Sequence, residues 1–278
     1  MEDWRKGRYS KQPSLQPSTP PVAWGTAMQL DQQIQKAATL ISQAKHIVAM
    51  TGAGISTPSG IPDFRSPNSG LWERVNPLAV ASIHAFRQSP EKFYDWIYPL
   101  TKQFLEAEPN PAHYALTSLE QQGKLKAIIT QNIDNLHRRA GSQIVYELHG
   151  HVREVVCTRC HQVQEAAQVF DKFVNDRLVP RCSCGGVLKP STILFGEQLP
   201  VQEFVAAQVA LQQADLLFVV GSSLEVAPAS DLPELALENG ASLVIINLQP
   251  TYLDSRADVL IRGDVAEVLP RIVELVAV

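Results

Sequence analysis

Short apolar runs alternate along this chain with segments of helical periodicity. Six such runs are the candidates for strands: His46–Thr51, Lys126–Thr130, Ile144–Leu148, Leu216–Gly221, Ser242–Asn247 and Asp258–Ile261. Strands that are apolar on both faces are buried on both faces, which is typical of a parallel sheet covered by helices. The sequence therefore predicts an α/β protein with a doubly wound parallel sheet.

The segments between these runs carry apolar residues at helical spacing. The first expected helix covers residues 28–41. A helix over residues 90–106 is expected to break or kink at Pro99, and a helix over Leu269–Val276 places Pro270 in its first turn, where proline is tolerated. The remaining expected helices cover residues 110–122, Val201–Gln213 and Ala229–Glu238.

The first 25 residues differ in composition from the rest of the chain. They are rich in Ser, Gln, Lys and Pro and show no hydrophobic period, so residues 1–25 are predicted to be a flexible tail and residues 26–278 the folded part. A net charge of −4 excludes the overall basic field of a nucleic-acid-binding protein. No apolar run is long enough to span a membrane, and residues 1–25 lack the apolar region of a secretory signal. We expect a cytoplasmic monomer.

All four cysteines of the chain fall within one short segment. Cys157 and Cys160 have the two-residue spacing of a zinc knuckle, and Cys182 and Cys184, followed by two glycines, form a tighter pair. Four thiolates fill a tetrahedral site, which predicts one structural Zn²⁺; free buried cysteines or a redox switch are the alternatives. Because the segment interrupts the alternation of strands and helices, residues 151–190 are predicted to be a small inserted module.

The first predicted strand runs into a loop that is dense in turn-forming residues. Its start, Gly52-Ala53-Gly54, is typical of a dinucleotide-binding turn, in which glycines let backbone N–H groups approach a pyrophosphate and a helix N-terminus favours anions. The third glycine of that pattern is absent, because Thr57 stands in its place, and a plain tight turn is the alternative. Ser56, Asp63 and Arg65 make the loop too polar for a core, and Arg65 suits a phosphate.

Polar residues follow several of the predicted strands. Ligands bind beyond the carboxyl ends of parallel strands, so Gln131, Asn132, Asp134 and His149 are expected to meet near the glycine turn. A single histidine is often only a packing residue, but within this cluster His149 is a candidate general base near neutral pH. Two further strand ends offer candidates for phosphate or ribose contacts: Gly221-Ser222-Ser223 and Asn247.

Six motifs together resemble the sirtuins, the NAD-dependent protein-lysine deacylases. The resemblance covers about residues 29–278, includes the four-cysteine segment in the expected place, and is strongest to the compact bacterial deacetylases. The motifs are Gly52-Ala53-Gly54-Ile55-Ser56, Gly60-Ile61-Pro62-Asp63-Phe64-Arg65, Thr130-Gln131-Asn132-Ile133-Asp134, Glu147-Leu148-His149-Gly150, Phe195-Gly196-Glu197 and Gly221-Ser222-Ser223-Leu224.

The resemblance implies a Rossmann-like NAD-binding part with an inserted zinc module. It implies an enzyme that removes acetyl or other acyl groups from lysine side chains of proteins and peptides, giving nicotinamide, O-acyl-ADP-ribose and free lysine. His149 matches the general base that deprotonates a ribose hydroxyl, and Asn132 and Asp134 match residues that hold the ribose and the nicotinamide amide. Phe64 matches an aromatic lid over the reactive carbon.

The resemblance also assigns the other residues of two binding sites. The NAD site would further include Gly52, Ala53, Gly54, Ser56, Thr57, Asp63, Arg65, Gln131, Ile133, Gly221, Ser222, Ser223, Asn247, Leu248, Asp264 and Val265. The peptide would lie as an added strand between two segments, which are Ile193, Leu194, Phe195 and Gly196 on one side and Leu224 and Glu225 on the other.

Three positions depart from the family pattern. The second cysteine pair has one intervening residue rather than the commoner two, and Pro190-Ser191 stands where Pro-Asp or Pro-Asn is usual. Members that prefer succinyl or malonyl groups carry Tyr-x-x-Arg in the region of residues 90–100. Here Tyr94 is followed three positions on by Ile97, so no arginine is placed to meet an acidic acyl group and acetyl is expected to be preferred.

Two other functions fit parts of the sequence. A nicotinamide dehydrogenase would need the complete glycine pattern and a hydride site, and it would reduce NAD, whereas a deacylase of this family releases nicotinamide. A zinc-ribbon binding module without activity would not need His149 or the pair Asn132 and Asp134.

Overall fold

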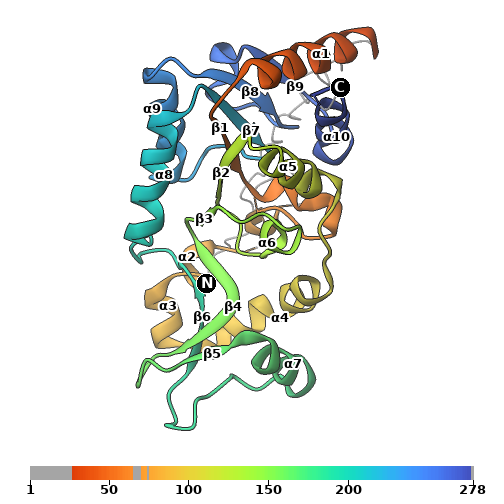
Figure 1. Cartoon of the computed structure of the whole chain (residues 1–278). Coiled ribbons are helices and arrows are strands. Elements are labelled where there is room, and N and C mark those ends of the chain that lie inside the picture. Colours follow the sequence, from red (N-terminus) through yellow and green to blue (C-terminus); the bar gives the residue numbers. More distant parts are fainter. Residues whose placement is uncertain (1–26, 65–69, 74, 277–278) are drawn as a thin grey trace, which may run out of the picture.

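A parallel sheet forms the larger part of the structure. The computed structural model describes residues 27–64, 70–73 and 75–276, and within them six strands pair in the order β3-β2-β1-β7-β8-β9, every pair parallel (Figure 1). The order runs outwards from the central pair β1 and β7 in both directions, so the predicted doubly wound α/β fold is confirmed. The strands are β1 (Ile47–Thr51), β2 (Leu125–Thr130), β3 (Val145–Glu147), β7 (Leu216–Val220), β8 (Ser242–Ile246) and β9 (Val259–Ile261).

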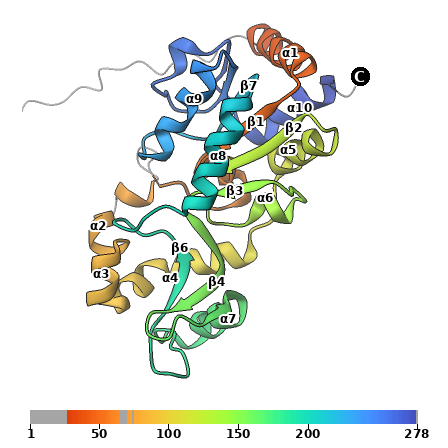
Figure 2. The same ribbon diagram turned by 60° about the vertical axis from the view of Figure 1, so that its left-hand side comes forward.

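Helices cover both faces of this sheet (Figures 1 and 2). Successive residues of a strand face opposite sides, so Ile47 and Ala49 pack under α1, α5 and α10, while Val48 and Met50 pack under α8 and α9. This double cover is the reason why the central strands are apolar at every position. The bounds are α1 (Ala27–Gln43), α5 (Pro111–Gln121), α8 (Val201–Gln213), α9 (Leu232–Glu238) and α10 (Val265–Val276).

The last helix begins earlier than the sequence predicted. It starts at Val265 rather than Leu269, so Pro270 lies in its interior and the placement of this proline in the first turn was wrong. The carboxylate of Asp264 accepts a hydrogen bond from the backbone N–H of Ala266 at 2.7 Å, and this contact at the helix start stabilises the additional turn.

Two other helices also differ from expectation. The helix α4 (Pro90–Glu106) continues through Pro99, so the expected break was wrong, and the alternative of a kink stays a prediction. The carbonyl group that this proline leaves without an N–H donor belongs to Asp95, an exposed residue, so water can bind it. The helix expected from Ala229 starts with a single 3₁₀ turn, Ala229–Asp231, before α9.

A smaller lobe, at the bottom of Figure 1, is built on an antiparallel sheet in the order β5-β4-β6. Val155 and Leu188 of this sheet pack against Phe170 of the helix that covers it. This lobe contains the four-cysteine segment, as the sequence predicted for an inserted module. The elements are β4 (Gly150–Cys157), β5 (Val163–Glu165), β6 (Leu188–Thr192) and α7 (Ala166–Asp176).

A second stretch of chain joins the smaller lobe, and the sequence did not predict it. The helix α4 packs on α7, with Tyr94 and Phe173 in edge-to-face contact at 5.0 Å between ring centres, and α2 (Pro77–Val80) and α3 (Ile83–Gln88) pack against α4. The buried hydroxyl of Tyr94 donates a hydrogen bond to the carbonyl oxygen of Leu188 at 2.5 Å, and burial raises its pKa. Tyr94 therefore ties α4 to β6.

The chain passes from the sheet into the small lobe between β3 and β4. Glu147 is only 6% exposed, and Arg153 donates two hydrogen bonds to its carboxylate, at 2.5 and 2.6 Å. Gly150 has a φ of +72°, and a β-carbon there would lie 2.1 Å from the carbonyl oxygen of Ser191. A side chain at Gly150 would therefore push β4 and β6 apart.

Replacing Gly150 by alanine should destabilise the fold more than backbone strain alone would. Gly240 provides the matched control, because its φ is +82° and a β-carbon there would meet nothing within 4 Å. We expect Gly240→Ala to lower the free energy of unfolding by about 1 kcal/mol, and Gly150→Ala to lower it by at least ~3 kcal/mol. Urea unfolding measures both, and equal losses would contradict the contact at Ser191.

Candidate active site

A cavity of about 860 Å³ lies where the sheet meets the small lobe. Its wall comes from the carboxyl ends of β1, β2, β7 and β8, and from the segment that follows β6. This brings most of the predicted site residues together. Those that line the cavity are Gly52, Ala53, Gly54, Thr57, Asp63, Phe64, Gln131, Asn132, Ile133, His149, Ile193, Leu194, Phe195, Gly196, Gly221, Ser222, Ser223, Glu225, Asn247, Leu248, Asp264 and Val265.

The glycines after β1 allow two turns to touch through their backbones. The N–H of Gly54 donates to the carbonyl oxygen of Gly221 at 2.8 Å, and the N–H of Gly52 donates to that of Val220 at 3.3 Å. A β-carbon at Gly54 would lie 2.8 Å from the Gly221 oxygen. Two short 3₁₀ turns follow instead of the α-helix N-terminus that the pattern suggested, and the N–H groups of Gly52 and Gly54 are already engaged. The contact of this loop with a pyrophosphate stays a prediction.

Among the described residues that were predicted for the NAD and peptide sites, three do not line the cavity. Ser56 and Asp134 are buried behind the wall, where the Ser56 hydroxyl donates to Asp134 Oδ2 at 2.7 Å and the N–H of Leu136, the first residue of α6 (Leu136–Arg139), donates to Oδ1 at 2.9 Å. Burial raises the pKa of Asp134, and these two hydrogen bonds oppose the shift. Leu224 is also buried, with a φ of +55°.

Asn132 connects this buried pair to the cavity. Its side-chain nitrogen donates to the carbonyl oxygen of Gly52 at 3.0 Å and to the hydroxyl of Ser56 at 3.1 Å. A carbonyl oxygen only accepts hydrogen bonds, which identifies the atom beside it as the amide nitrogen. The amide oxygen Oδ1 is therefore the atom of Asn132 that can accept a hydrogen bond from a ligand.

His149 lies at the cavity wall between β3 and β4. Its Nδ1 is 3.0 Å from the carbonyl oxygen of Gln131. Because a carbonyl cannot donate, the neutral imidazole carries its hydrogen on Nδ1 and keeps its lone pair on Nε2. His149 is thus held in the tautomer that a general base needs.

Aromatic side chains line the end of the cavity nearest α4. Trp72 and Trp96 stack with ring centres 5.2 Å apart. The ring centre of Phe64 is also 5.2 Å from that of Trp72. Phe93, Trp96 and Ile97 lie on one face of α4 and line the cavity. The sequence pointed to Phe64 but not to Phe93 and Trp96, although their spacing with Ile97 of three and four residues marks one face of a helix. Tyr94 points away, into the small lobe.

The charged residues in the described part of the cavity wall are all acidic. They are Asp63, Glu197, Glu225 and Asp264. The Glu197 carboxylate is paired with Lys189 at 2.9 Å. Arg65, which was predicted to contact NAD, lies outside the described residues. From the described residues, an anionic ligand group can therefore obtain hydrogen bonds only from uncharged donors.

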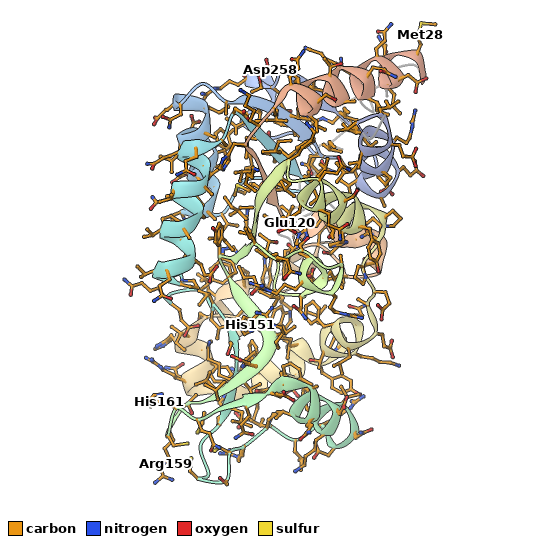
Figure 3. All side chains as sticks on the ribbon, in the orientation of Figure 1. Met28, Glu120, His151, Arg159, His161 and Asp258 are labelled. Atoms are coloured by element: carbon orange, nitrogen blue, oxygen red, sulfur yellow. The ribbon has the colours of Figure 1, made fainter. Side chains whose placement is uncertain are left out.

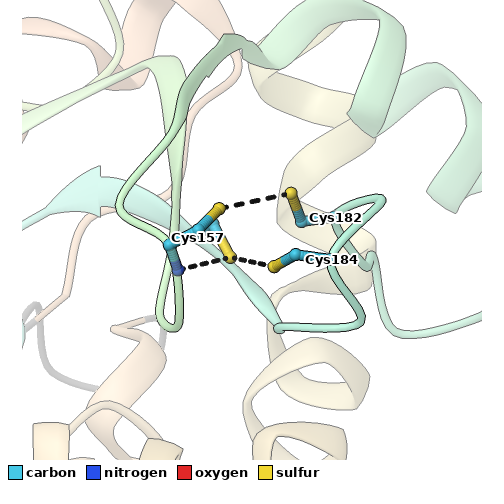
Figure 4. A group of neighbouring side chains, drawn as sticks. Cys157, Cys182 and Cys184 are labelled. Atoms are coloured by element: carbon cyan, nitrogen blue, oxygen red, sulfur yellow. Dashed lines mark hydrogen bonds between the residues drawn. The ribbon is translucent and has the colours of Figure 1, made fainter.

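The four cysteines are gathered in the small lobe, in the region where Figure 3 labels Arg159 and His161. All four Sγ atoms lie within 4.8 Å of one another, and none forms a disulfide. Cys157 and Cys184 are 3.4 Å apart and Cys160 and Cys182 are 3.7 Å apart (Figure 4). A tetrahedral Zn²⁺ with bonds of about 2.3 Å needs sulfurs roughly 3.8 Å apart, so these residues fit the metal.

The backbone around Cys157 also favours the thiolate that zinc requires. Hydrogen bonds to its sulfur from the N–H groups of Cys160 and Arg159 lower its pKa to about 6. A β-carbon at Gly186 would lie 2.5 Å from the same sulfur, so the glycine after the tight pair leaves room for the cluster. The shorter spacing of Cys182 and Cys184 does not prevent the four sulfurs from meeting.

We expect one Zn²⁺ per chain in freshly purified protein, measured by elemental analysis. Cys157→Ala should remove the metal and unfold the small lobe, because the binding free energy of a structural zinc contributes to folding. Ser183→Ala is the matched control, since this exposed residue stands between two ligands without being one. Zinc-free protein with an intact lobe would contradict the metal site.

Comparison with known proteins agrees with this arrangement. A model of the Sir2 family matches residues 52–228. The NAD-dependent protein deacylase 2 of Archaeoglobus fulgidus is 46% identical over 247 residues, which are 88% of this chain and 96% of that protein. The NAD-dependent protein deacetylase 1 of Geobacillus kaustophilus is 44% identical over 238 residues, 85% of this chain and 96% of that protein.

Solved structures show the same likeness. A Sir2 variant in complex with a deacetylated p53 peptide and 3′-O-acetyl ADP-ribose is 40% identical, with a TM-score of 0.82 over 87% of this chain and 97% of that one. Sir2Af2 bound to a myristoylated histone peptide is 40% identical, with a TM-score of 0.77 over 88% and 97%. Within the described residues, every helix is too short or too polar to cross a lipid bilayer. The matches to the family model and to relatives over most of the chain show that this protein belongs to the Sir2 family.

Proposed function

We propose that this protein removes acetyl and related acyl groups from lysine side chains of proteins. NAD is the second substrate, and the products are nicotinamide, O-acyl-ADP-ribose and free lysine. Family membership supports this function, because relatives that match most of the chain are named NAD-dependent protein deacetylases or deacylases. The observation that carries it is His149, held by a carbonyl oxygen in the general-base tautomer at the wall of the cavity.

His149 and Asn132 do different work in this reaction. NAD, when bound, supplies the ribose carbon that loses nicotinamide and receives the acyl oxygen. His149 takes a proton from a ribose hydroxyl at Nε2, and the carbonyl of Gln131 stabilises the resulting imidazolium through Nδ1–H. Asn132 accepts a hydrogen bond from the ligand at Oδ1, because both hydrogens of its amide nitrogen are engaged.

Asp134 supports these groups from behind the wall. Its carboxylate holds the Ser56 hydroxyl, which in turn accepts a hydrogen bond from Asn132. The contact of Asp134 with the nicotinamide amide, which the family resemblance implies, stays a prediction. So does the contact of Arg65 with the cofactor.

The peptide binds between the segment after β6 and the segment after β7. The first segment is anchored on both sides, because Ile193 donates to the carbonyl oxygen of His149 at 2.8 Å and Phe195 donates to that of Ala81 at 2.9 Å. Glu225, which follows β7, also lines the cavity. The acyl-lysine side chain enters the cavity between these two segments. Because Ile193 is hydrogen-bonded to the backbone of His149, the position of the bound peptide relative to His149 is fixed.

The zinc site has a structural role in this proposal. Zn²⁺ would join the start of the β4–β5 turn to the segment before β6, and none of its four ligands lines the cavity. That the enzyme acts as a cytoplasmic monomer, with no affinity for nucleic acid or membranes, stays a prediction from the sequence.

Removing the general base should abolish most of the turnover. We expect His149→Ala to lower kcat on an acetyl-lysine peptide by about 10²–10⁴-fold, with little change in affinity for NAD. His84→Ala is the control, because His84 is exposed on α3 and does not line the cavity. Release of nicotinamide, measured by chromatography, also excludes a dehydrogenase, which would form reduced NAD instead. Near-normal turnover in His149→Ala would contradict the assignment.

The lining of α4 predicts the preferred acyl group. Phe93, Trp96 and Ile97 offer no cation to a carboxylate, and burying an unpaired carboxylate is costly. A difference of roughly 2–3 kcal/mol corresponds to about 30–150-fold in kcat/KM in favour of acetyl over succinyl-lysine. Butyryl-lysine is the matched control, because it has the four carbons of succinyl without the charge. Equal kcat/KM on the succinyl and butyryl peptides would show that another residue meets the carboxylate.

A further inference from the structure

Two histidines outside the cavity are fully buried and face each other. His113 on α5 is 0% exposed and His137 on α6 is 2% exposed. Their rings are 4.9 Å apart, centre to centre, at an angle of 59°. Nε2 of His113 and Nδ1 of His137 are buried and have no hydrogen-bond partner among the described residues. Buried polar atoms are rarely left in this state, so a link between the two rings is expected.

The contacts of His113 determine which of its nitrogens carries the hydrogen. The backbone N–H of Asn110 donates to His113 Nδ1 at 3.3 Å, so Nδ1 is the acceptor. Burial lowers the pKa of His113 to about 4, which keeps the ring neutral near pH 7. The single hydrogen of the neutral ring is therefore on Nε2, and this buried donor needs an acceptor.

His137 can supply that acceptor in only one tautomer. Burial and, to a smaller extent, His113 lower its pKa well below the ordinary value, so it too carries one hydrogen. If that hydrogen were on Nδ1, His137 Nδ1 and His113 Nε2 would both be buried donors without an acceptor among the described residues. With the hydrogen on Nε2, Nδ1 is an acceptor that a single bridging water can connect to His113 Nε2, and Nε2 donates to the hydroxyl of Thr51 at 2.9 Å.

Two further hydrogen bonds connect Thr51 to Asn132 at the cavity wall. The Thr51 hydroxyl donates to the hydroxyl of Thr130 at 2.9 Å, and the backbone N–H of Asn132 donates to that hydroxyl at 3.0 Å. Thr51 and Thr130 are the last residues of β1 and β2 and are paired across the sheet. We propose that the chain from His113 through His137, Thr51 and Thr130 positions Asn132, and that His137 and Thr51 are positioning residues for the NAD site.

This inference rests on the proposed function only where it assigns Asn132 to NAD. Loss of the chain would free the Thr130 hydroxyl to rotate, and Asn132 would lose the acceptor of its N–H. The amide of Asn132 bridges Gly52 and Ser56, so a shift of its backbone would move the oxygen offered to NAD. Binding of NAD should suffer more than binding of the peptide.

The tautomers of the two histidines can be tested without an assay of enzyme activity. In protein labelled with ¹⁵N-histidine, long-range ¹H–¹⁵N correlations should show both His113 and His137 neutral at pH 7, each with its hydrogen on Nε2. Spectra of His113→Gln and His137→Gln assign the signals. A hydrogen on Nδ1 of His137, or a charged ring at either position, would overturn the chain even if the enzyme proves to be a deacylase.

The positioning role is tested by kinetics of two variants at one residue. We expect His137→Phe to raise KM for NAD by about 10-fold, with kcat and the KM for an acetyl-lysine peptide within ~3-fold of the parent. His137→Gln should return KM for NAD to within ~3-fold, because its amide can still donate to Thr51. If both variants lose thermal stability but keep the parent's KM for NAD, His137 is only structural and the proposal fails.

Thr51→Val removes the next hydroxyl of the same chain, and it is the alternative test if His137→Phe does not fold. It should raise KM for NAD as much as His137→Phe does, and the double variant should be no worse than either single one. Thr101→Val is the matched control, because Thr101 is buried on α4 and its hydroxyl donates to the carbonyl oxygen of Ile97, which is not part of the chain. Additive effects of the two substitutions, or an equal rise in the control, would overturn the coupling.

Discussion

The backbone contact between the turn after β1 and the turn after β7 is the constraint on which the site depends. Gly54 and Gly221 touch through N–H and carbonyl groups, and a β-carbon at Gly221 would lie 2.3 Å from the nitrogen of Ile55. Because the two turns meet without side chains between them, the ends of the central strands form one continuous floor. Asn132 is bonded to the Gly52 carbonyl oxygen on that floor. The separation of the site residues is therefore set by backbone and not by flexible side chains.

Histidine acts as a base at one place in this structure and as a fixed hydrogen-bond donor at another. The group that is hydrogen-bonded to the Nδ1 atom determines which of the two it is. The Nδ1–H group of His149 donates a hydrogen bond to a carbonyl oxygen, so Nε2 keeps its lone pair and His149 can act as a base at the cavity wall. His113 accepts from a backbone N–H, so its remaining nitrogen becomes a donor inside the core. The first arrangement suits proton transfer. The second suits a fixed hydrogen bond, because burial keeps the ring neutral.

The sequence predicted the sheet and most of the cavity wall for the same physical reason. Strands buried on both faces are apolar throughout, and polar residues directly after them, such as Asn132 and His149, must gather at one edge of a parallel sheet. It did not distinguish Ser56 and Asp134, which lie behind the wall, because the direction of a side chain after a strand depends on the turn. Helical periodicity likewise identified α4 but not its lining face, since Phe93 and Tyr94 are both buried, one toward each side. Pro270 was misplaced because the hydrogen bond at Asp264 is a local contact that composition does not reveal.

The apolar end of the cavity also bears on how the product leaves. An acyl-lysine side chain ends in a neutral amide, which can enter a space lined by Trp96 and Ile97 at little electrostatic cost. Removal of the acyl group creates an ammonium ion in the same place. None of the acidic residues described in the cavity wall lies on α4. An unpaired charge in apolar surroundings costs on the order of several kcal/mol. If this lining rejects a succinyl carboxylate, as we predict, it also disfavours the lysine ammonium, and selection of a neutral substrate and release of a charged product would follow from one property of the cavity.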